Sequence, residues 1–320
     1  MTVFTDLASL ETVSAVPSGA VFVLGHFDGV HAGHRALLTE AVRMAAARGS
    51  FILPAVWTLT GLDKGGALTT EDEKLRLLRR FGAGWVAADD FSEIRSMSGE
   101  DFFRERILSR SPAGVICGYN FTFGRGASSG AEDLRRMAHD AGIACAVVPP
   151  VEFGGAPVSS TQIRQLVESG SMEEAAALLG RPWSVSGTVC HGHEIGRTMG
   201  FPTVNLRLPP EKAAPPRGVY ASVIRREKDG IPVFSGGVSN LGARPTVNGD
   251  ADDVTLETNL FVSPGDLYGC EITVWLLRFL RPERKFGSLG ELRDAISADS
   301  AEARQVTESL WSRYEDAFLP

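Results

Sequence analysis

The stretch LGHFDGVHAGHRALL, residues 24–38, decides how the first half of the chain folds. It begins where the apolar run VFVL at 21–24 ends, and it leads into a helical pattern from Arg35 to Arg48. An apolar run followed by a glycine-rich turn and a helix is typical of a βα unit. The turn holds three of the six histidines of the chain: His26, His31 and His34.

The chemistry of this turn favours a bound phosphate. Glycines at 25, 29 and 33 would let the backbone approach a ligand closely. Backbone amides and the positive end of the helix dipole attract anionic oxygen at a helix start. His31 and His34 could donate hydrogen bonds to the charge that builds on a phosphoryl group during transfer. We therefore expect a site for a nucleoside triphosphate.

Two other interpretations of the histidine pair stay open at this point. His31 and His34 could simply cap or solvate the turn. They could also bind zinc, although ligand pairs on a helix face usually lie four residues apart and these two lie three apart.

From Val21 to Val148 short apolar runs alternate with helical patterns, which predicts an α/β domain with a doubly wound parallel sheet. We expect strands at 21–24, 51–57, near 85, at 115–117 and near 145, and helices at 35–48, 70–81, 99–109 and 132–141. Ligands of such sheets bind beyond the carboxyl ends of the strands, which is where the histidine turn lies.

The pattern changes at Arg181-Pro182, after two short helices expected in SSTQIRQLVESGSMEEAAALLG. Beyond this point short β-like runs are separated by Gly, Pro and Asn turns, which predicts an antiparallel β-barrel or sandwich closed by helices from Leu289 to the end. We therefore expect two domains, residues 1–181 and 182–320.

Composition narrows the class of protein. With 320 residues, 43% hydrophobic and 22% charged, the chain is typical of a folded globular protein. A net charge of −7 argues against a broad electrostatic grip on nucleic acid or on a membrane surface. The four cysteines are far apart, and the first residues lack a signal-peptide pattern, so we expect a cytoplasmic protein.

Two further segments of the first half carry ligand-type residues. In SSTQIRQLVESG, residues 159–170, Ser159, Ser160 and Thr161 precede a helical pattern and could satisfy its first amides or a bound phosphate, with Arg164 facing the same end. An ordinary N-cap with a surface arginine is the alternative. The other segment, CGYNFTFGRG at 117–126, follows a central strand.

These three segments resemble, in the same order, those of the nucleotidyltransferase superfamily in its FAD synthetase branch, the bifunctional riboflavin kinases and FMN adenylyltransferases of bacteria. The resemblance implies that His31 and His34 are catalytic in adenylyl transfer. It also implies nucleotide or flavin contacts at Gly25, Phe27, Asp28, Gly29, Asn120, Ser159, Ser160, Thr161 and Arg164.

The second domain opens with RPWSVSGTVCHGHEIGRTMGFPTVNL, which is similar to the riboflavin kinase signature. Glycine-rich loops can hold ATP phosphates with backbone amides. The resemblance implies this role for Gly192, Gly196, Arg197 and Gly200. Thr203 and Asn205, two apart in an extended segment, point the same way and offer oxygen ligands for Mg²⁺, which the family assigns to them.

The stretch LETNLF at 256–261 matches the part of the kinase pattern that supplies a base for the ribityl hydroxyl. By this resemblance Glu257 is the catalytic base, although an isolated Glu in an alternating strand is usually a solvated surface residue. LRPERKF at 280–286 is also similar to the family, and it suggests a place for Arg281 near the flavin.

The resemblance implies phosphorylation of riboflavin by ATP to give FMN, then adenylylation of FMN to FAD with release of pyrophosphate, with Mg²⁺ as cofactor. One departure matters: the chain has WTLTGLDKGGAL where family members usually carry Thr-Phe-x-Pro-His-Pro. The alternative is therefore a riboflavin kinase with a degenerate, regulatory N-terminal domain. A transferase for another phosphorylated acceptor and a non-catalytic flavin-binding regulator also stay open.

Overall fold

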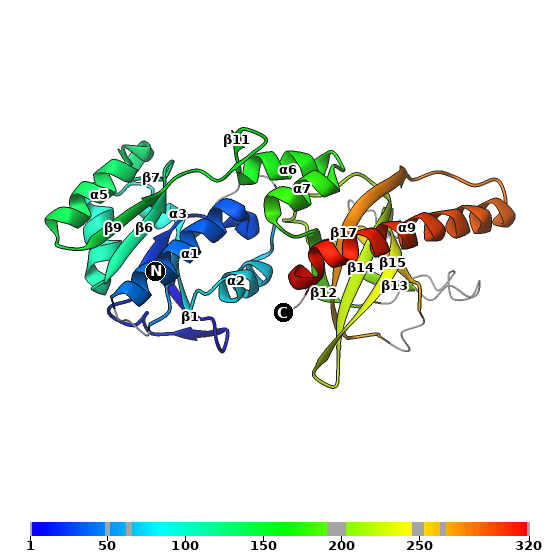
Figure 1. The fold of residues 1–320 in the computed structure, drawn as a ribbon, viewed down its shortest axis with the longest axis horizontal. Coiled ribbons are helices and arrows are strands. Elements are labelled where there is room, and N and C mark those ends of the chain that lie inside the picture. Colours follow the sequence, from blue (N-terminus) through cyan, green and yellow to red (C-terminus); the bar gives the residue numbers. More distant parts are fainter. Residues whose placement is uncertain are drawn as a thin grey trace. The chain divides into compact units, whose positions relative to one another are not determined.

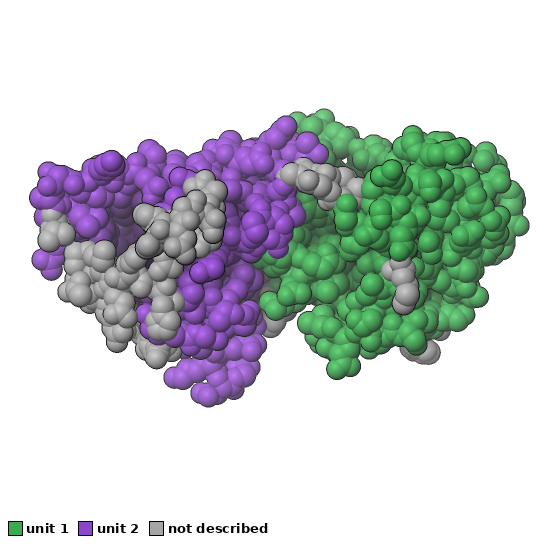
Figure 2. All heavy atoms as spheres, turned by 180° about the vertical axis from the view of Figure 1, so that it is seen from behind, with its two compact units in different colours: residues 1–65, 69–160 green, residues 66–68, 161–320 purple. Residues whose placement is uncertain are grey.

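The computed structural model describes residues 2–48, 52–61, 66–190, 203–244, 253–262 and 267–318. The chain divides into two compact units, residues 1–65 with 69–160 and residues 66–68 with 161–320 (Figure 2). The second unit takes in the two short helices before Arg181, and the expected boundary between residues 181 and 182 stays a prediction.

The first unit is built on a seven-stranded sheet in the order β2-β1-β5-β4-β3-β6-β9 (Figure 1). Its strands are β1 (Val3–Asp6), β2 (Glu11–Val13), β3 (Val21–Leu24), β4 (Ala55–Thr60), β5 (Trp85–Asp90), β6 (Gly114–Gly118) and β9 (Ala144–Val148). The five from β3 onward are parallel, and their order reverses at β3, so β3 and β6 flank the switch point where such sheets bind ligands. The predicted doubly wound sheet is confirmed.

Helices cover both faces of this sheet. One apolar layer joins the sheet to α1 (Ala32–Ala47) and α2 (Glu71–Arg80), and the other joins it to α4 (Gly99–Phe102), the π-helical turn η2 (Phe103–Ile107) and α5 (Ala131–Asp140). The short elements are η1 (Asp28–Val30), α3 (Phe91–Ile94), η3 (Leu108–Arg110), β7 (Thr122–Phe123), η4 (Arg125–Ala127), β8 (Ser129–Gly130), β10 (Glu152–Phe153) and β11 (Ala156–Pro157).

The antiparallel strands β1 and β2 extend the sheet beyond β5 and were not predicted. Residues 3–13 alternate polar and apolar side chains too weakly to signal a strand, and only pairing with β5 gives them that form.

The second unit is a curled six-stranded antiparallel sheet in the order β12-β17-β14-β15-β16-β13. Its strands are β12 (Trp183–Thr188), β13 (Thr203–Arg207), β14 (Gly218–Lys228), β15 (Ile231–Arg244), β16 (Asp253–Leu260) and β17 (Glu271–Pro282). The two edges meet beyond β12, where an isolated bridge pairs Cys190 with Asn205 of β13 and Cys190 N donates to Asn205 O at 2.9 Å. The predicted antiparallel barrel is confirmed.

Helices complete this unit. The predicted helical C-terminus is the single helix α9 (Leu289–Phe318), which lies along β14, β15 and β17 (Figure 1) and buries Val306 and Leu310 against the outer face of the sheet. The helices α6 (Ser160–Glu168) and α7 (Met172–Leu179) were predicted from their apolar spacing.

Candidate active sites

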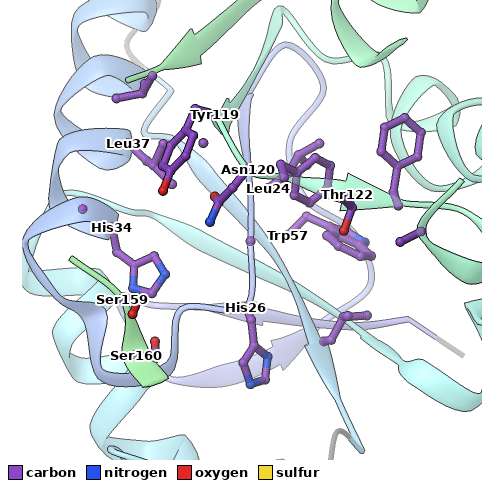
Figure 3. A pocket seen from close by; sticks show the side chains of 18 of the residues that line it. Leu24, His26, His34, Leu37, Trp57, Tyr119, Asn120, Thr122, Ser159 and Ser160 are labelled. Atoms are coloured by element: carbon purple, nitrogen blue, oxygen red, sulfur yellow. The ribbon is translucent and has the colours of Figure 1, made fainter. Parts of the chain in front are cut away.

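A cavity of about 530 Å³ lies in the first unit, at the carboxyl ends of its parallel strands. Figure 3 shows its two chemically different sides: His34, Ser159 and Ser160 gather on one side, and Trp57 and Thr122 lie on the other. The cavity therefore combines polar groups with an aromatic wall at the switch point of the sheet, where α/β proteins hold nucleotides.

The turn between β3 and α1 has an unusual backbone. Phe27 (φ 60°) and Val30 (φ 39°) are non-glycine residues with positive φ, and Gly29 lies between them at φ 78°. Such conformations cost bulky residues free energy and persist only where packing enforces them, as it does for the fully buried Phe27 and Val30. Gly25 leaves room for the Phe27 ring, because a Cβ at this position would lie 3.0 Å from it. The strained turn fixes where α1 begins.

His31 is the N-cap of α1, and its Nδ1 accepts a hydrogen bond from Gly33 N at 3.2 Å. A neutral imidazole that accepts at Nδ1 carries its hydrogen on Nε2 and can donate from there. His31 is 6% exposed, and its ring stacks on His34 with 3.8 Å between centroids. The capping interpretation and the ligand interpretation of His31 are thus compatible, because Nδ1 caps the helix and Nε2 is a separate hydrogen-bonding group.

Two hydroxyl groups brace the turn. Ser160 Oγ donates to Asp28 O at 2.8 Å, and Gly29 N donates to Thr69 Oγ1 at 3.3 Å. Thr69 was not predicted, because a threonine between two elements has no distinctive signal in the sequence. Ser160 therefore connects the start of α6 to the histidine turn across 132 positions of sequence.

The structure brings many of the predicted residues of the first domain together. The cavity is lined by Gly25, His31, His34, Asn120, Ser159 and Ser160. Phe27, Asp28 and Gly29 are buried and support the turn, and the Phe27 ring lies 4.9 Å from that of His34. Thr161 and Arg164 belong to the second unit, where Arg164 Nε donates to Gly66 O at 2.6 Å.

The aromatic wall of the cavity was missed by the sequence analysis. Trp57 of β4 packs edge-on against Phe102 at 4.8 Å between centroids, and Phe123 lies 5.3 Å from Phe102 and 5.6 Å from Phe121. All four residues line the cavity. Aromatic residues at strand ends are equally common in cores, so nothing in the sequence marks these as ligand contacts.

Strand register assembles the second candidate site, on the barrel. Glu257 of β16 is directly opposite Asn205 of β13 on one side and Asn240 of β15 on the other. Directly opposed residues point to the same face of a sheet, so the three side chains form a row on the outer face. Asn240 was not predicted, and its Nδ2 donates to Glu283 Oε1 at 3.2 Å.

A second row lies one pleat away. Thr203 is paired with Asn259, on the same face as the row through Asn205. Asn259 Nδ2 is buried and has no hydrogen-bond partner among the residues that the structure describes. A buried unsatisfied donor is costly, so this group fits a site that a ligand completes. The predicted residues Gly192, Gly196, Arg197 and Gly200 lie outside the described residues.

The side chain of Arg281, on β17, makes its contacts with other residues of the barrel unit. Its guanidinium donates to both carboxylate oxygens of Asp299 on α9, at 2.9 and 2.7 Å, and lies 5.7 Å from the Phe286 ring centroid. Asp299 is 8% exposed, so this bidentate pair ties α9 to the sheet. A flavin contact of Arg281 stays a prediction.

The described residues contain no group of three or more His, Cys, Asp or Glu side chains placed to hold a metal ion. The stacked histidines consequently have no third ligand of these types within that part of the chain.

Comparison with known families matches both halves of the chain. The family model described as FAD synthetase matches residues 13–162, and the one described as riboflavin kinase matches residues 179–307. The chain is 34% identical to the bifunctional riboflavin kinase/FMN adenylyltransferase of Escherichia coli K12, over 93% of this chain and 96% of that protein. The protein of the same name from Bacillus subtilis is 32% identical, over 91% and 93%.

A crystal structure described as a macrolide-efflux protein from Streptococcus pneumoniae superposes with a TM-score of 0.80 at 30% identity, covering 94% of this chain and 97% of that one. Within the described residues, no helix is both long and apolar enough to cross a membrane. The two domain matches and the full-length relatives agree, and the chain belongs to the family of bifunctional riboflavin kinases/FMN adenylyltransferases.

Proposed function

We propose that this chain makes FAD in two steps at two separate sites. The barrel unit transfers the γ-phosphoryl group of ATP to riboflavin, and the α/β unit adenylylates the resulting FMN. The observation that carries the proposal is the cavity of the first unit, which joins a stacked histidine pair to an aromatic wall. It offers hydrogen-bond donors for phosphate and a flat apolar surface for a flavin ring.

In the kinase step Glu257 is the general base. Its carboxylate accepts the proton of the ribityl hydroxyl while the hydroxyl oxygen attacks the γ-phosphorus and the bond to the β-phosphate oxygen breaks, releasing ADP. Asn205 and Asn240 flank Glu257 in register and orient the groups around it. A direct in-line displacement needs no covalent intermediate.

Thr203 and Asn205 fit a magnesium ion. Their hydroxyl and carboxamide oxygens are the hard donors that Mg²⁺ prefers, and two protein ligands leave room for waters and nucleotide phosphates. When bound, the ion would neutralise charge on the ATP phosphates. Thr203 and Asn205 would hold it, and Glu257 lies directly opposite Asn205.

In the adenylyl step an oxygen of the FMN phosphate attacks the α-phosphorus of a second ATP, and the bond to the β-phosphate oxygen breaks to release pyrophosphate. His31 and His34 donate to the charge on the α-phosphoryl group. Ser159 and Ser160 lie at the start of α6 beside the histidines, and Asn120 contacts the flavin or the pyrophosphate.

In the kinase half, the proposed role in ATP binding stays with the loop residues Gly192, Gly196, Arg197 and Gly200.

The second candidate is a riboflavin kinase whose first unit only binds flavin or nucleotide. The missing Pro-His-Pro sequence favours it, since small displacements near a reacting phosphate are costly. The histidine pair, its helix cap and its two braces favour an active transferase instead. We place either enzyme in the cytoplasm, in keeping with its four free cysteines.

One incubation separates the candidates. The purified protein is supplied with riboflavin, ATP and magnesium, and the flavins are resolved over time by chromatography. FMN that rises and then converts to FAD supports the two-step proposal. FMN that accumulates without FAD selects the kinase with a regulatory first unit, and no product at all contradicts both.

A further inference from the structure

The first unit contains a buried carboxylate that neither reaction step uses. Asp89, at the end of β5, is 0% exposed and is not among the residues lining the cavity. It is paired in register with Leu59 of β4, two residues beyond Trp57 on the same face. Asp89 therefore lies directly behind the aromatic wall.

Two hydrogen-bond donors and one arginine cation surround this carboxylate. Trp57 Nε1 donates to Asp89 Oδ2 at 2.7 Å, and Arg106 Nε lies 3.9 Å from the same oxygen. Thr2 Oγ1 donates to the other oxygen, Oδ1. A buried carboxylate is costly unless such partners surround it, so the donors and the carboxylate fix one another's positions.

The contact with Trp57 reaches the cavity directly. Trp57 is 2% exposed, lines the cavity, and packs edge-on against Phe102. An indole that rotated away from Asp89 would leave its N–H buried without an acceptor, which is unfavourable. Asp89 thereby holds the ring of Trp57 in one orientation and sets the shape of the aromatic wall.

The N-terminal strand closes this arrangement from outside. Arg110 Nη2 donates to Thr2 Oγ1 at 2.9 Å, and the Arg110 guanidinium lies 5.3 Å from the centre of the Phe4 ring. Strand β1 pairs along β5 and so covers the edge beside Asp89. The family match begins at residue 13, so β1 lies before the matched region.

We propose, building on the adenylyl transfer proposed above, that Asp89 is a positioning residue for acceptor recognition. Through Trp57 it shapes the wall that receives the planar ring system of FMN, and Thr2 of the N-terminal segment completes the acceptor site. Recognition of ATP, at the histidine side of the cavity, does not depend on this chain of contacts.

Three substitutions test the proposal in the full-length protein. Asp89→Asn replaces one carboxylate oxygen with an amide NH2 group, so Trp57 and Thr2 can no longer both donate to this side chain. Trp57→Phe keeps an aromatic ring without the N–H, and Thr2→Val removes the hydroxyl at nearly constant size. Trp85→Phe is the matched control, because Trp85 packs in the same apolar layer on β5 but does not line the cavity.

We expect Asp89→Asn and Trp57→Phe each to raise the KM for FMN about fivefold to tenfold, and Thr2→Val about twofold to threefold, as lost single hydrogen bonds do. The double variant of Asp89 and Trp57 should raise it by less than the product of the two single increases, since the two changes share one contact. The KM for ATP, the riboflavin kinase rate and the behaviour of Trp85→Phe should match the wild type.

Several outcomes would overturn this role. An unchanged KM for FMN in folded Asp89→Asn would do so. Equal increases in the KM for FMN and the KM for ATP, together with a lowered melting temperature, would also do so, because they indicate a purely structural carboxylate. If Asp89→Asn fails to fold, Thr2→Val decides. If the wild type makes no FAD, the transferase proposal fails on its own. The role of Asp89 is then tested by FMN affinity, measured by quenching of flavin fluorescence, for which we expect the same order of effects among the variants.

Discussion

The two candidate sites are built in different ways. In the α/β unit the histidines lie on a strained turn, held by a buried Phe27 at positive φ and by hydrogen bonds from Ser160 and to Thr69. In the barrel unit Glu257 lies in the middle of a strand, and its neighbours Asn205 and Asn240 follow from antiparallel register. A site on a turn depends on hydrogen bonds to residues that are distant in sequence. A site on strands depends on the backbone pairing of those strands. Substitutions that touch braces should therefore affect only the first site.

The largest expected effect concerns Glu257. Glu257→Gln keeps the size of the side chain and removes the base, so the rate of FMN formation should fall by about 10³-fold, within the range for general base catalysis. FAD formation from supplied FMN should stay at the wild-type rate. Glu227→Gln on β14, an exposed glutamate paired with Arg225, is the control. Equal loss of both activities in Glu257→Gln would contradict two separate sites.

A smaller effect is expected for the histidine turn. His34→Ala removes a donor to the α-phosphoryl group and should slow FAD formation from FMN by about 10²-fold, as removal of one such donor typically does. The kinase rate should not change. His139→Ala is the control, because that side chain is 89% exposed on α5. If His34→Ala leaves FAD formation intact, the stacked pair has no part in transfer.

The hydrogen bond from Ser160 to the histidine turn tests most directly whether the first site depends on residues distant in sequence. Ser160→Ala removes the hydrogen bond to Asp28 O, and a loss of about 1 kcal/mol in positioning corresponds to roughly fivefold slower FAD formation. Ser169→Ala, which removes an exposed bond to Leu166 O within the same segment, should have no effect. Equal rates for wild type and Ser160→Ala would mean that packing around Phe27 alone holds the turn.

The sequence predicts the features that local pattern determines, and it does not predict those that depend on contacts between distant residues. Apolar runs and helical spacing were sufficient for β3, α1 and the alternation of parallel strands with helices, because local pattern and burial agree there. The pairing of Asn240 with Glu257 could not be predicted, since register depends on how the strands align in three dimensions. The contact between Asp89 and Trp57 was missed for the same reason, because the two residues lie 32 positions apart and nothing in the sequence links them.

The smallest expected effect is a difference in thiol reactivity between the two units. Burial raises the pKa of Cys117, on β6 beneath the cavity, to about 12, and it also raises the pKa of Cys145. Because the folded value is raised, the folded state holds its proton more tightly than the unfolded state. The contribution to stability is complete below about pH 9 and is lost as pH rises toward about 12.

At pH 8 iodoacetamide should therefore label the partly exposed Cys190 and Cys270 before Cys117, as peptide mass spectrometry can show. Rapid labelling of Cys117 in the native protein would mean that the sheet beneath the cavity opens readily, and the rigid support that the histidine turn requires would then be absent.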